Sequence, residues 1–500
     1  MINLIRPTVL IVGLILLPFS SHPQWIQVGN DIDGSEAADR SGSSVSLSED
    51  GDIVAIGSLL NSDGLPGSGE VRVLQNFSGE WEQIGQNIYG ETAGEKSGRY
   101  VSLNADGTTI AIGAYDNGEN GKSSGQVRVY KFINNMWQQI GEDINGDKIG
   151  DYAGWSVSLN DDGNILAVGI RGDTDNGVGS GFVRVYRYHS GDWQQIGDDI
   201  KGKTPREQSG WDIDLSADGS RVAISGVDTA RNDTLFGAIR VYENRANAWI
   251  QLGEDIYGEN PGDYFGWSIS LSEDGNTVAG SSYYNADGGV SAGHARVFRF
   301  TDGAWNQMGQ DIDGQAGDLF GNSVSLSADG TKIAVGAIAS YGNSGHISIY
   351  NHDTSANEWL KIGNDIVAEG GGDSAGWSVS LSTNGHVVAH GAIGNTNENG
   401  VDSGHVRVFT NSSLGLSQIT VLDNIVMHPN PTIDLAYIDL SKIVESAEVQ
   451  ISNVNGKILD EYHFVNSMIL KIDLSQYSYG LYFVQLEYEG KKVVFKLLVK

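Results

Sequence analysis

Cysteine is absent from this chain of 500 residues. Disulfide bonds, cysteine nucleophiles, thiolate metal sites and a lipid-modified N-terminal cysteine are therefore excluded. A chain of this length can bury a large apolar core, so it does not need covalent cross-links for its stability.

Basic residues are scarce. The chain has 31 Lys and Arg residues against 63 Asp and Glu residues, and its formal net charge is −32. A field of this sign repels phosphate backbones and anionic lipids, so we expect neither a nucleic-acid nor a membrane-surface partner. The surplus of acids is typical of a well-solvated surface.

Long apolar runs are confined to the start of the chain. Residues 1–24 have one charge, Arg6, an apolar stretch from Val9 to Phe19, and the small residues Ser20 and Ser21 near a plausible cleavage point. This pattern predicts a signal peptide, since the stretch is too short to span a bilayer comfortably. A retained membrane anchor is the alternative. We expect no membrane span in the mature form.

Familiar catalytic motifs are also missing. There is no P-loop, dinucleotide fingerprint, zinc-protease motif or G-x-S-x-G elbow, so we predict no cofactor, no metal and no catalytic residues. Carboxylates are plentiful, but no pair has a spacing that singles it out for glycoside hydrolysis. Three histidines, His294, His346 and His405, occupy equivalent repeat positions, which common ancestry of the repeats explains better than a shared site.

What the chain does contain is glycine, at 68 residues, and a long internal repeat. The repeat is marked by a tryptophan, spaced by 56 residues five times and then by 54, at Trp25, Trp81, Trp137, Trp193, Trp249, Trp305 and Trp359. Each unit also contains an Asp-Gly or Asn-Gly pair between two apolar segments, which predicts a tight hairpin turn. Seven copies of one unit indicate a repeat architecture.

Four strands fit each unit. In the third unit they are expected at 155–160, 165–169, 182–188 and 193–197, with a turn at Asp162-Gly163. A repeated four-stranded antiparallel meander is typical of a β-propeller blade.

The order of strands at the two chain ends favours ring closure. The chain starts with a fourth-type strand, Trp25 to Gly29, and its last unit ends with a third-type strand, His405 to Thr410. Pairing these two strands would leave no blade incomplete. We therefore predict an all-β fold: a seven-bladed β-propeller at 25–417, closed by the N-terminal strand, followed by a small C-terminal β-sandwich at 418–500.

The repeats resemble FG-GAP propeller repeats, which occur in integrin α-chain heads. The resemblance covers roughly residues 25–417 and rests on Phe265-Gly266, Phe320-Gly321, Gly113-Ala114, Gly336-Ala337 and Gly391-Ala392. Calcium-binding members of that family hold the ion in a long acidic loop between the first two strands. Here that loop is a short Asp-Gly hairpin, which cannot supply six to eight oxygen ligands, so the calcium site is not carried over.

The C-terminal residues resemble the type A sorting domain of the type IX secretion system. The matching motif residues are Pro429, Asn430, Pro431, Gly456, Lys457, Gly480, Lys496 and Lys500. The resemblance implies that residues 418–500 bind the type IX secretion machinery, and that the protein is secreted or attached to the outer-membrane surface of a Gram-negative bacterium.

Candidate ligand-binding residues come from two sets. Four tryptophans that open the first strand of a blade could stack on sugar rings, although blade-to-blade packing is the alternative: Trp155, Trp211, Trp267 and Trp377. The second set lies in the long loops on one face: Asn117, Asp175, Asn232, Asp287 and Asn397. The third-strand arginines, such as Arg184 and Arg240, are expected to bind Asp199 and Asp255 and to join neighbouring strands or blades.

These observations predict a secreted or cell-surface, non-catalytic binding or adhesion module, whose partner is a polysaccharide or a surface protein. An extracellular hydrolase or lyase acting on polysaccharide is the alternative, and a self-associating surface-coat protein is a third class.

Overall fold

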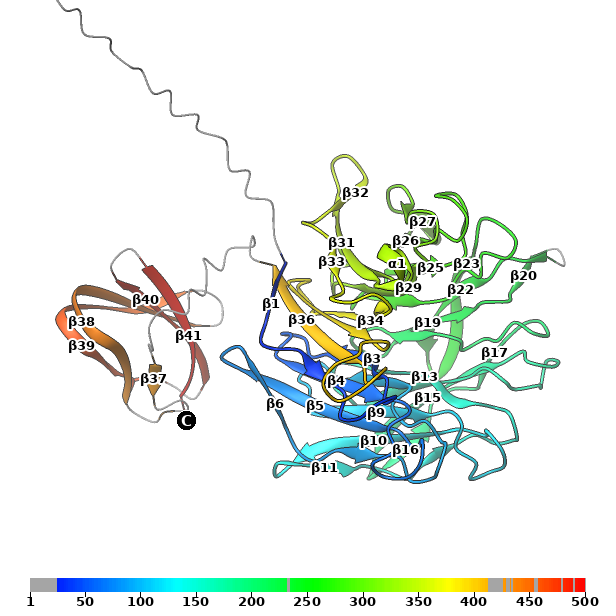
Figure 1. Cartoon of the computed structure of the whole chain (residues 1–500), viewed down its shortest axis with the longest axis horizontal. Coiled ribbons are helices and arrows are strands. Elements are labelled where there is room, and N and C mark those ends of the chain that lie inside the picture. Colours follow the sequence, from blue (N-terminus) through cyan, green and yellow to red (C-terminus); the bar gives the residue numbers. More distant parts are fainter. Residues whose placement is uncertain are drawn as a thin grey trace, which may run out of the picture. The chain divides into compact units, whose positions relative to one another are not determined.

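The structure is a computed structural model that describes residues 25–231, 234–411, 426–428, 432, 435–453, 457–477, 480–488 and 491–499 (Figure 1). The predicted signal peptide at 1–24 lies outside these ranges. So do Asn232, Pro429, Asn430, Pro431, Gly456 and Lys500. The chain divides into two compact units, Met1–Asn411 and Ser412–Lys500.

The described part of the first unit consists of small antiparallel sheets built almost entirely from hairpins. The first sheet contains β3 (Ser41–Leu47), β4 (Ile53–Ser58), β5 (Glu70–Phe77), β6 (Glu80–Gln83) and β7 (Ile88–Tyr89). The second contains β8 (Tyr100–Leu103), β9 (Thr109–Ala114), β10 (Gln126–Ile133), β11 (Met136–Gln139) and β12 (Ile144–Asn145). The third contains β13 (Ala153–Leu159), β14 (Ile165–Ile170), β15 (Phe182–His189), β16 (Asp192–Gln195) and β17 (Ile200–Lys201).

The remaining sheets of this unit repeat the pattern. The fourth contains β18 (Ile213–Leu215), β19 (Arg221–Gly226), β22 (Ala238–Arg245) and β23 (Ala248–Tyr257), with a small hairpin of β20 (Ala230–Arg231) and β21 (Thr234–Leu235) beside it in sequence. The fifth contains β24 (Ile269–Leu271), β25 (Thr277–Ser282), β26 (His294–Thr301), β27 (Ala304–Gln307) and β28 (Ile312–Asp313). The sixth contains β29 (Phe320–Leu326), β30 (Lys332–Ala337), β31 (His346–Asp353), β32 (Glu358–Lys361) and β33 (Ile366–Val367), with the single helical turn α1 (Ser340–Asn343) before β31.

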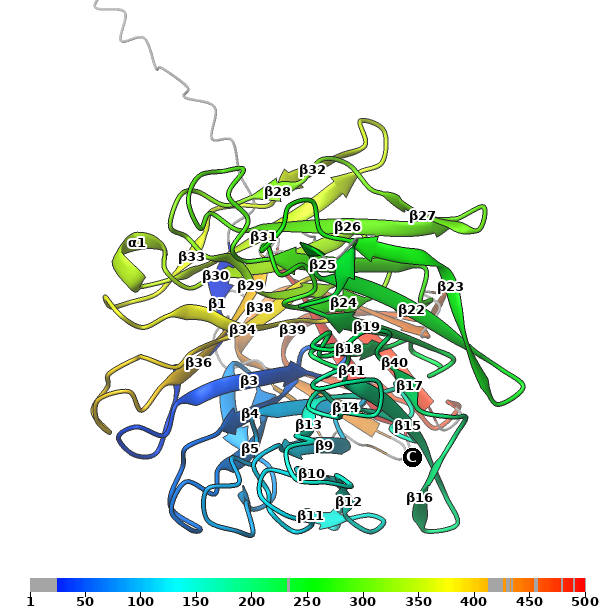
Figure 2. The same cartoon turned by 90° about the vertical axis from the view of Figure 1, so that its right-hand side faces the viewer.

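The seventh sheet combines the two ends of the unit. It contains β34 (Ala375–Leu381), β35 (Val387–Ala392) and β36 (His405–Asn411), together with β1 (Trp25–Gln27) and β2 (Ile32–Asp33). In β1, Trp25 pairs with Asn411 and Gln27 pairs with Phe409. Figure 2 shows the sheets following one another around a common centre, in the order of the sequence.

The predicted strands of the third unit all exist, within two residues of their expected ends. The sequence missed a fifth element, the two-residue strand that follows the tryptophan strand. In the third sheet this is β17, which pairs with β15 through Val183 and Ile200. The chain turns at Gly197, whose φ is 72°, and returns to pair with the same strand.

The turn between the first two strands differs in detail from the expected two-residue turn. Gly163 has a φ of 66°, but Asp162 is not in the positive-φ region. The Gly163 N–H donates to the carbonyl oxygen of Asn160 at 2.9 Å, so the chain makes a four-residue β-turn that ends in a left-handed glycine. The glycine is required there, whereas the aspartate accepts hydrogen bonds in several equivalent turns. In the second sheet, for example, the N–H of Thr108 donates to Asp106 Oδ1 at 2.9 Å.

The tryptophans that define the repeat join each sheet to the preceding one. The Trp193 Nε1–H donates to the carbonyl oxygen of Ile140 at 3.1 Å, and the Trp137 Nε1–H donates to that of Ile84 at 2.9 Å. Trp25 donates in the same way to Ile362, at 3.1 Å. Neighbouring sheets also share apolar cores: Val127 and Val129 of β10 pack in one cluster with Val157 of β13. A buried indole with a satisfied N–H explains why this residue marks the repeat.

The described strands of the second unit are β37 (Val426–His428), β38 (Leu435–Asn453), β39 (Ile458–Asp473), β40 (Gly480–Tyr488) and β41 (Lys491–Val499). They form one hydrogen-bonded sheet rather than two separate ones, because the 19-residue β38 pairs with β37, β39 and β40 along its length. A register shift between Asp439 and Val444 interrupts the β38–β39 pairing, and Thr432 bridges to Val499. The predicted sandwich therefore takes the form of a single sheet around one apolar core.

Three of the predicted sorting-motif residues lie in described segments of this unit. Gly480 begins β40 opposite Val499, and Lys496 pairs with Phe483. The Lys457 N–H donates to Asn453 Oδ1 at 3.1 Å, which closes the hairpin turn between β38 and β39.

None of the helical structure in the described ranges has the length and apolar character needed to span a lipid bilayer.

Candidate functional site

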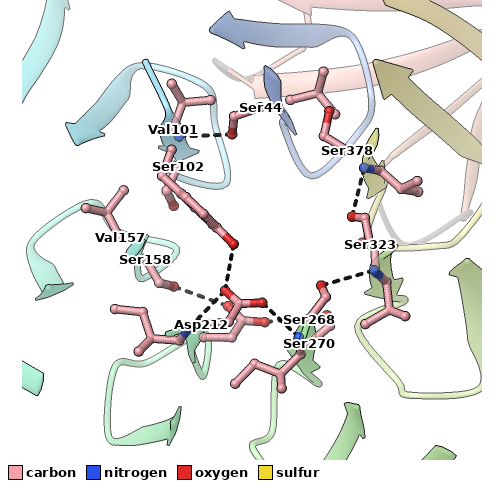
Figure 3. Close-up of a pocket in the computed structure, with 18 of the residues that line it drawn as sticks. Ser44, Val101, Ser102, Val157, Ser158, Asp212, Ser268, Ser270, Ser323 and Ser378 are labelled. Atoms are coloured by element: carbon pink, nitrogen blue, oxygen red, sulfur yellow. Dashed lines mark hydrogen bonds between the residues drawn. The ribbon is translucent and has the colours of Figure 1, made fainter. Parts of the chain in front are cut away.

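The first strands of the seven sheets line a central cavity of about 230 Å³ (Figure 3). These strands are β3, β8, β13, β18, β24, β29 and β34, and each contributes consecutive residues of its W-S-V-S-L-like segment. We call this space the central cavity. Its wall is mainly serine hydroxyls and β-branched side chains, which suits a polar ligand or ordered water.

The serines of the cavity wall satisfy the backbone of the neighbouring sheet. Each first strand is an edge strand, so its outer N–H groups need acceptors. Ser102 Oγ accepts from the N–H of Leu159 at 2.9 Å, and Ser158 Oγ accepts from that of Leu215 at 3.0 Å. Likewise, Ser380 Oγ accepts from the N–H of Leu47 at 3.0 Å. This explains the recurrent V-S-L-S pattern as a structural requirement.

The fourth sheet departs from this pattern because two aspartates replace the serines. Asp214 Oδ2 accepts from the N–H of Leu271 at 2.7 Å, and Asp212 Oδ2 accepts from that of Ile269 at 2.8 Å. From the second sheet, Tyr100 also takes the place of a serine, and its hydroxyl donates to Asp212 Oδ1 at 3.2 Å. Figure 3 shows Asp212 among the serines of the cavity wall.

Asp212 is buried and Asp214 is partly buried, and within the described residues neither forms a salt bridge. Burial raises the pKa of Asp212 to about 7, with the nearby Asp214 carboxylate acting in the same direction. Burial also raises the pKa of Asp214 to about 6. The pKa of the Tyr100 hydroxyl is raised as well, first by burial and then by Asp212. The sequence analysis missed this cluster, although W-D-I-D-L in place of W-S-V-S-L was a visible signal.

The four predicted tryptophans do come together, at one edge of the central cavity. We call Trp155, Trp211, Trp267 and Trp377 the aromatic rim; all four line the cavity and all four are half-buried. The ring centroids of Trp155 and Trp211 are 5.2 Å apart, and those of Trp211 and Trp267 are 4.9 Å apart. The rim thus packs from sheet to sheet and still exposes part of its surface.

Other aromatic side chains extend the rim. Tyr115 contacts Trp155 with 4.9 Å between centroids, and Tyr283 stacks on Trp267 at 4.1 Å. Trp211 Nε1–H donates to the carbonyl oxygen of Trp267 at 3.0 Å. At the equivalent position of the sixth sheet, Asn322 Nδ2–H donates to the carbonyl oxygen of Trp377 at 2.8 Å.

The predicted loop residues are not part of this site. Of the four that the structure describes, none lines the central cavity: Asn117, Asp175, Asp287 and Asn397. Asn117 is buried and donates to Glu95 Oε2 at 2.8 Å, while Asn397 donates to Asp33 Oδ1 at 2.8 Å. These loop amides hold neighbouring loops together. Asp287 is exposed, and Asp175 binds Lys148 and Lys201 at 2.7 and 2.9 Å.

The third-strand arginines bind the acids named from the sequence. Arg184 Nε donates to Asp199 Oδ1 at 2.8 Å, and Arg240 Nε lies 2.9 Å from Asp255 Oδ2. Each of these acids belongs to the same sheet as its arginine, so these pairs do not join sheets. Arg240 also binds Glu207, which lies in the segment that connects the third and fourth sheets and which the sequence analysis did not name.

Two side-chain clusters in the described residues have the composition of a metal site. One consists of Asp31, Glu369 and His405, and the other of Glu259, His294 and Asp311. In each cluster, an arginine on the same strand as the histidine lies near both carboxylates. Arg407 Nε is 3.3 Å from Asp31, and Arg296 Nε is 3.6 Å from Asp311. The positive charge of the guanidinium opposes that of a cation at the same oxygens.

The comparison with family models gives two matches. Residues 426–500 match the secretion system C-terminal sorting domain, and residues 311–350 match the FG-GAP repeat. The chain therefore contains an FG-GAP repeat and a type IX secretion sorting domain. The sorting domain indicates that the protein is secreted or surface-attached in a Gram-negative bacterium, and implies an interaction with the type IX machinery.

The solved structures that are similar to this chain have low sequence identity to it. A putative 6-phosphogluconolactonase from Bacteroides fragilis is 14% identical, with 66% of this chain and 85% of that chain covered and a TM-score of 0.47. The β-propeller domain of the Trilobed protease from Pyrococcus furiosus is 11% identical, with 74% and 91% covered and a TM-score of 0.41. The comparison with curated proteins gives no match.

Proposed function

We propose that residues 25–417 form one closed, seven-bladed propeller that acts as a non-catalytic binding or adhesion module outside the cell. Residues 418–500 would deliver it through the type IX machinery. The pairing of β1 with β36 and the indole hydrogen bonds between successive sheets support the ring. The ligand would be a polysaccharide or a glycosylated surface protein.

The aromatic rim is the observation that carries this proposal. Four half-buried tryptophans from different sheets meet around one polar cavity, while the seven tryptophans of the repeat lie on other strands and donate to backbone carbonyls. Partly exposed aromatic faces beside hydroxyl groups suit the apolar face and the hydroxyl edge of a sugar ring.

Replacing Trp377 with alanine should weaken glycan binding about tenfold or more, because truncating a central aromatic contact residue removes most of its contact area. The measurement is binding of the mature secreted protein to a glycan array, followed by titration with the best glycan. Trp249→Phe is the matched control, since its indole lies outside the rim and donates to Ile196 at 3.0 Å. Equal loss in both variants, or no glycan binding by the parent protein, would contradict the proposal.

A polysaccharide hydrolase or lyase is the second candidate, and a specific observation favours it. Asp212, Asp214 and Tyr100 converge on the central cavity, and a buried carboxyl with a pKa near neutrality can act as a general acid. If this candidate holds, the protein depolymerises a polysaccharide and Asp212→Asn reduces the rate at least a hundredfold. Release of reducing ends is the assay; no release from any polysaccharide that the protein binds would rule out hydrolysis.

A further inference from the structure

Two arginines beside the aromatic rim form no salt bridge within the described residues. Arg171 follows β14, and its guanidinium carbon lies 3.5 Å from the ring centroid of Trp155 and 5.2 Å from that of Trp211. Arg99 directly precedes β8, and its guanidinium carbon lies 5.4 Å from the Trp155 centroid and 5.1 Å from that of Tyr100. Within the described residues, no carboxylate forms a salt bridge with either guanidinium.

Arg171 and Arg99 differ in this respect from the third-strand arginines of the chain. Acidic residues outnumber basic residues by 63 to 31, and the third-strand arginines all have carboxylates within 4 Å: Arg72, Arg128, Arg184, Arg240, Arg296 and Arg407. Asp116, an acid that acts on Arg171 through space, is held by Lys96 at 2.6 Å. Arg171 and Arg99 therefore hold two positive charges beside the rim without a salt bridge to any described residue, although the carboxyls of Asp212 and Asp214 line the same cavity.

The Arg171 guanidinium is also incompletely hydrogen-bonded. Its Nη1–H donates to Gln208 Oε1 at 2.7 Å, but its buried Nε–H has no acceptor among the described residues. Burial lowers the pKa of Arg171, with the Arg99 charge acting in the same direction. A half-buried cation with a free donor loses solvation without gaining a counter-charge, and an incoming anion would supply both.

Two tryptophans of the rim also have an Nε1–H without an acceptor in the described part of the chain. Among the described residues, no group accepts a hydrogen bond from Nε1 of Trp267 or Trp377, whereas the repeat tryptophans donate to carbonyl oxygens. Trp377 also has no aromatic partner there, so its ring is free to stack. Serine hydroxyls below the rim, including Ser268 and Ser323, add polar groups of the kind that bind sugar hydroxyls.

From these contacts we infer that the aromatic rim binds a carboxylate-bearing saccharide, with Arg171 and Arg99 holding the carboxylate and Trp377 stacking on a sugar ring. This inference deepens the proposed glycan-binding function and rests on it. A planar guanidinium forms two parallel hydrogen bonds to a carboxylate, which a neutral sugar cannot accept with the same strength. Hydroxyl-lined walls and stacking faces favour a saccharide over an acidic peptide.

The test uses the mature full-length protein and defined oligosaccharides. Oligogalacturonate, alginate and hyaluronan oligosaccharides are each compared with their carboxyl-reduced, neutral forms by calorimetric titration. We expect at least one acidic form to bind at least tenfold more tightly than its neutral form. Arg171→Gln and Arg99→Gln should each weaken that binding about tenfold, as expected for loss of a charged hydrogen bond.

Arg187→Gln is the matched control, because Arg187 is exposed on β15 and outside the cavity and the variant loses the same unit charge. It should bind as the parent does. Unfolding temperatures measured in parallel identify a variant that does not fold. If Arg171→Gln does not fold, Arg99→Gln serves in its place, since the Arg99 guanidinium contacts the rings of Tyr100 and Trp155.

Several outcomes would overturn the inference. Equal binding of acidic and neutral forms, with Arg171→Gln unchanged and Trp377→Ala impaired, would reject it and leave the glycan-binding function standing. Equal loss in Arg187→Gln would show unspecific attraction to polyanions. Arginine-dependent binding of polyglutamate, with no binding of the oligosaccharides, would assign the rim to an acidic peptide. No binding on the glycan array would reject the inference and the proposed function together.

Discussion

Replacing Arg240 with methionine should lower the free energy of unfolding of the propeller by about 3–5 kcal/mol, because it leaves buried carboxylates without their counter-charge. The Arg240 side chain is 5% exposed and binds Glu207, which is 0% exposed, and Asp255, which is 9% exposed. Burial acts against ionisation of Asp255, but the charge of Arg240 and the hydrogen bonds from Lys203, Gln251 and Arg240 together lower the pKa of Asp255 to about 2. Lys203 also pairs with Asp255 at 2.8 Å, so Glu207 is the carboxylate that depends most on the Arg240 guanidinium.

Chemical denaturation at neutral pH, with circular dichroism as the readout, measures this effect. Arg184→Met is the matched control: Arg184 occupies the equivalent position of the third sheet, but its second partner, Asp147, is 53% exposed. Water can solvate that acid, so the control should lose only about 1 kcal/mol. Adding Glu207→Gln to Arg240→Met should restore part of the stability. Equal effects of the two arginine substitutions would contradict the assignment of a buried pair.

Replacing Asp212 with asparagine should remove a pH dependence of stability worth about 4 kcal/mol. The folded-state pKa of Asp212 is raised by burial from 3.8 to about 7, so the folded protein holds a proton that the unfolded chain has already released. The contribution of this carboxyl to stability is then fully present below pH 3.8 and is lost as the pH rises through about 7. Asparagine stays neutral, so the variant should gain stability relative to the parent from pH 4 to pH 8.

The measurement is the difference in unfolding free energy between variant and parent at pH 4, 5, 6, 7 and 8, which cancels the titration of the other acids. Asp302→Asn, in the exposed turn between β26 and β27, is the control for removing one carboxylate outside the central cavity. A constant difference for Asp212→Asn would show that this carboxyl is ionised at acidic pH in the folded protein.

The repeat could be predicted from the sequence because its recurring tryptophan and glycine residues are each required by the structure. A tryptophan that donates to the preceding sheet, such as Trp193 to Ile140, recurs at fixed spacing, and a glycine with positive φ follows each first strand. The strand boundaries of the third unit followed from these marks and from alternation of apolar residues. The sorting domain was recognised from motif order, and the family comparison confirms it.

The site was only partly predictable. The rim tryptophans were visible as residues, but their meeting at one cavity depends on how the sheets are arranged. The predicted loop residues that the structure describes do not line this cavity. A polar residue in a loop can contact a ligand or hold two loops together, and the sequence does not distinguish the two: Asn117 is buried against Glu95. Arg171 was not considered, since an arginine after the second strand gives no sign of whether an acid lies nearby in space.

The sharing of the seventh sheet between the two ends of the propeller has a consequence for biogenesis. Arg407 donates to Gln27, 380 positions away, so the first strand to leave the ribosome waits for almost the last one before its edge is covered. Contacts of such high sequence separation form slowly and favour late completion of the fold. We therefore expect the seventh sheet to be the last sheet of this unit to complete its hydrogen bonding during folding.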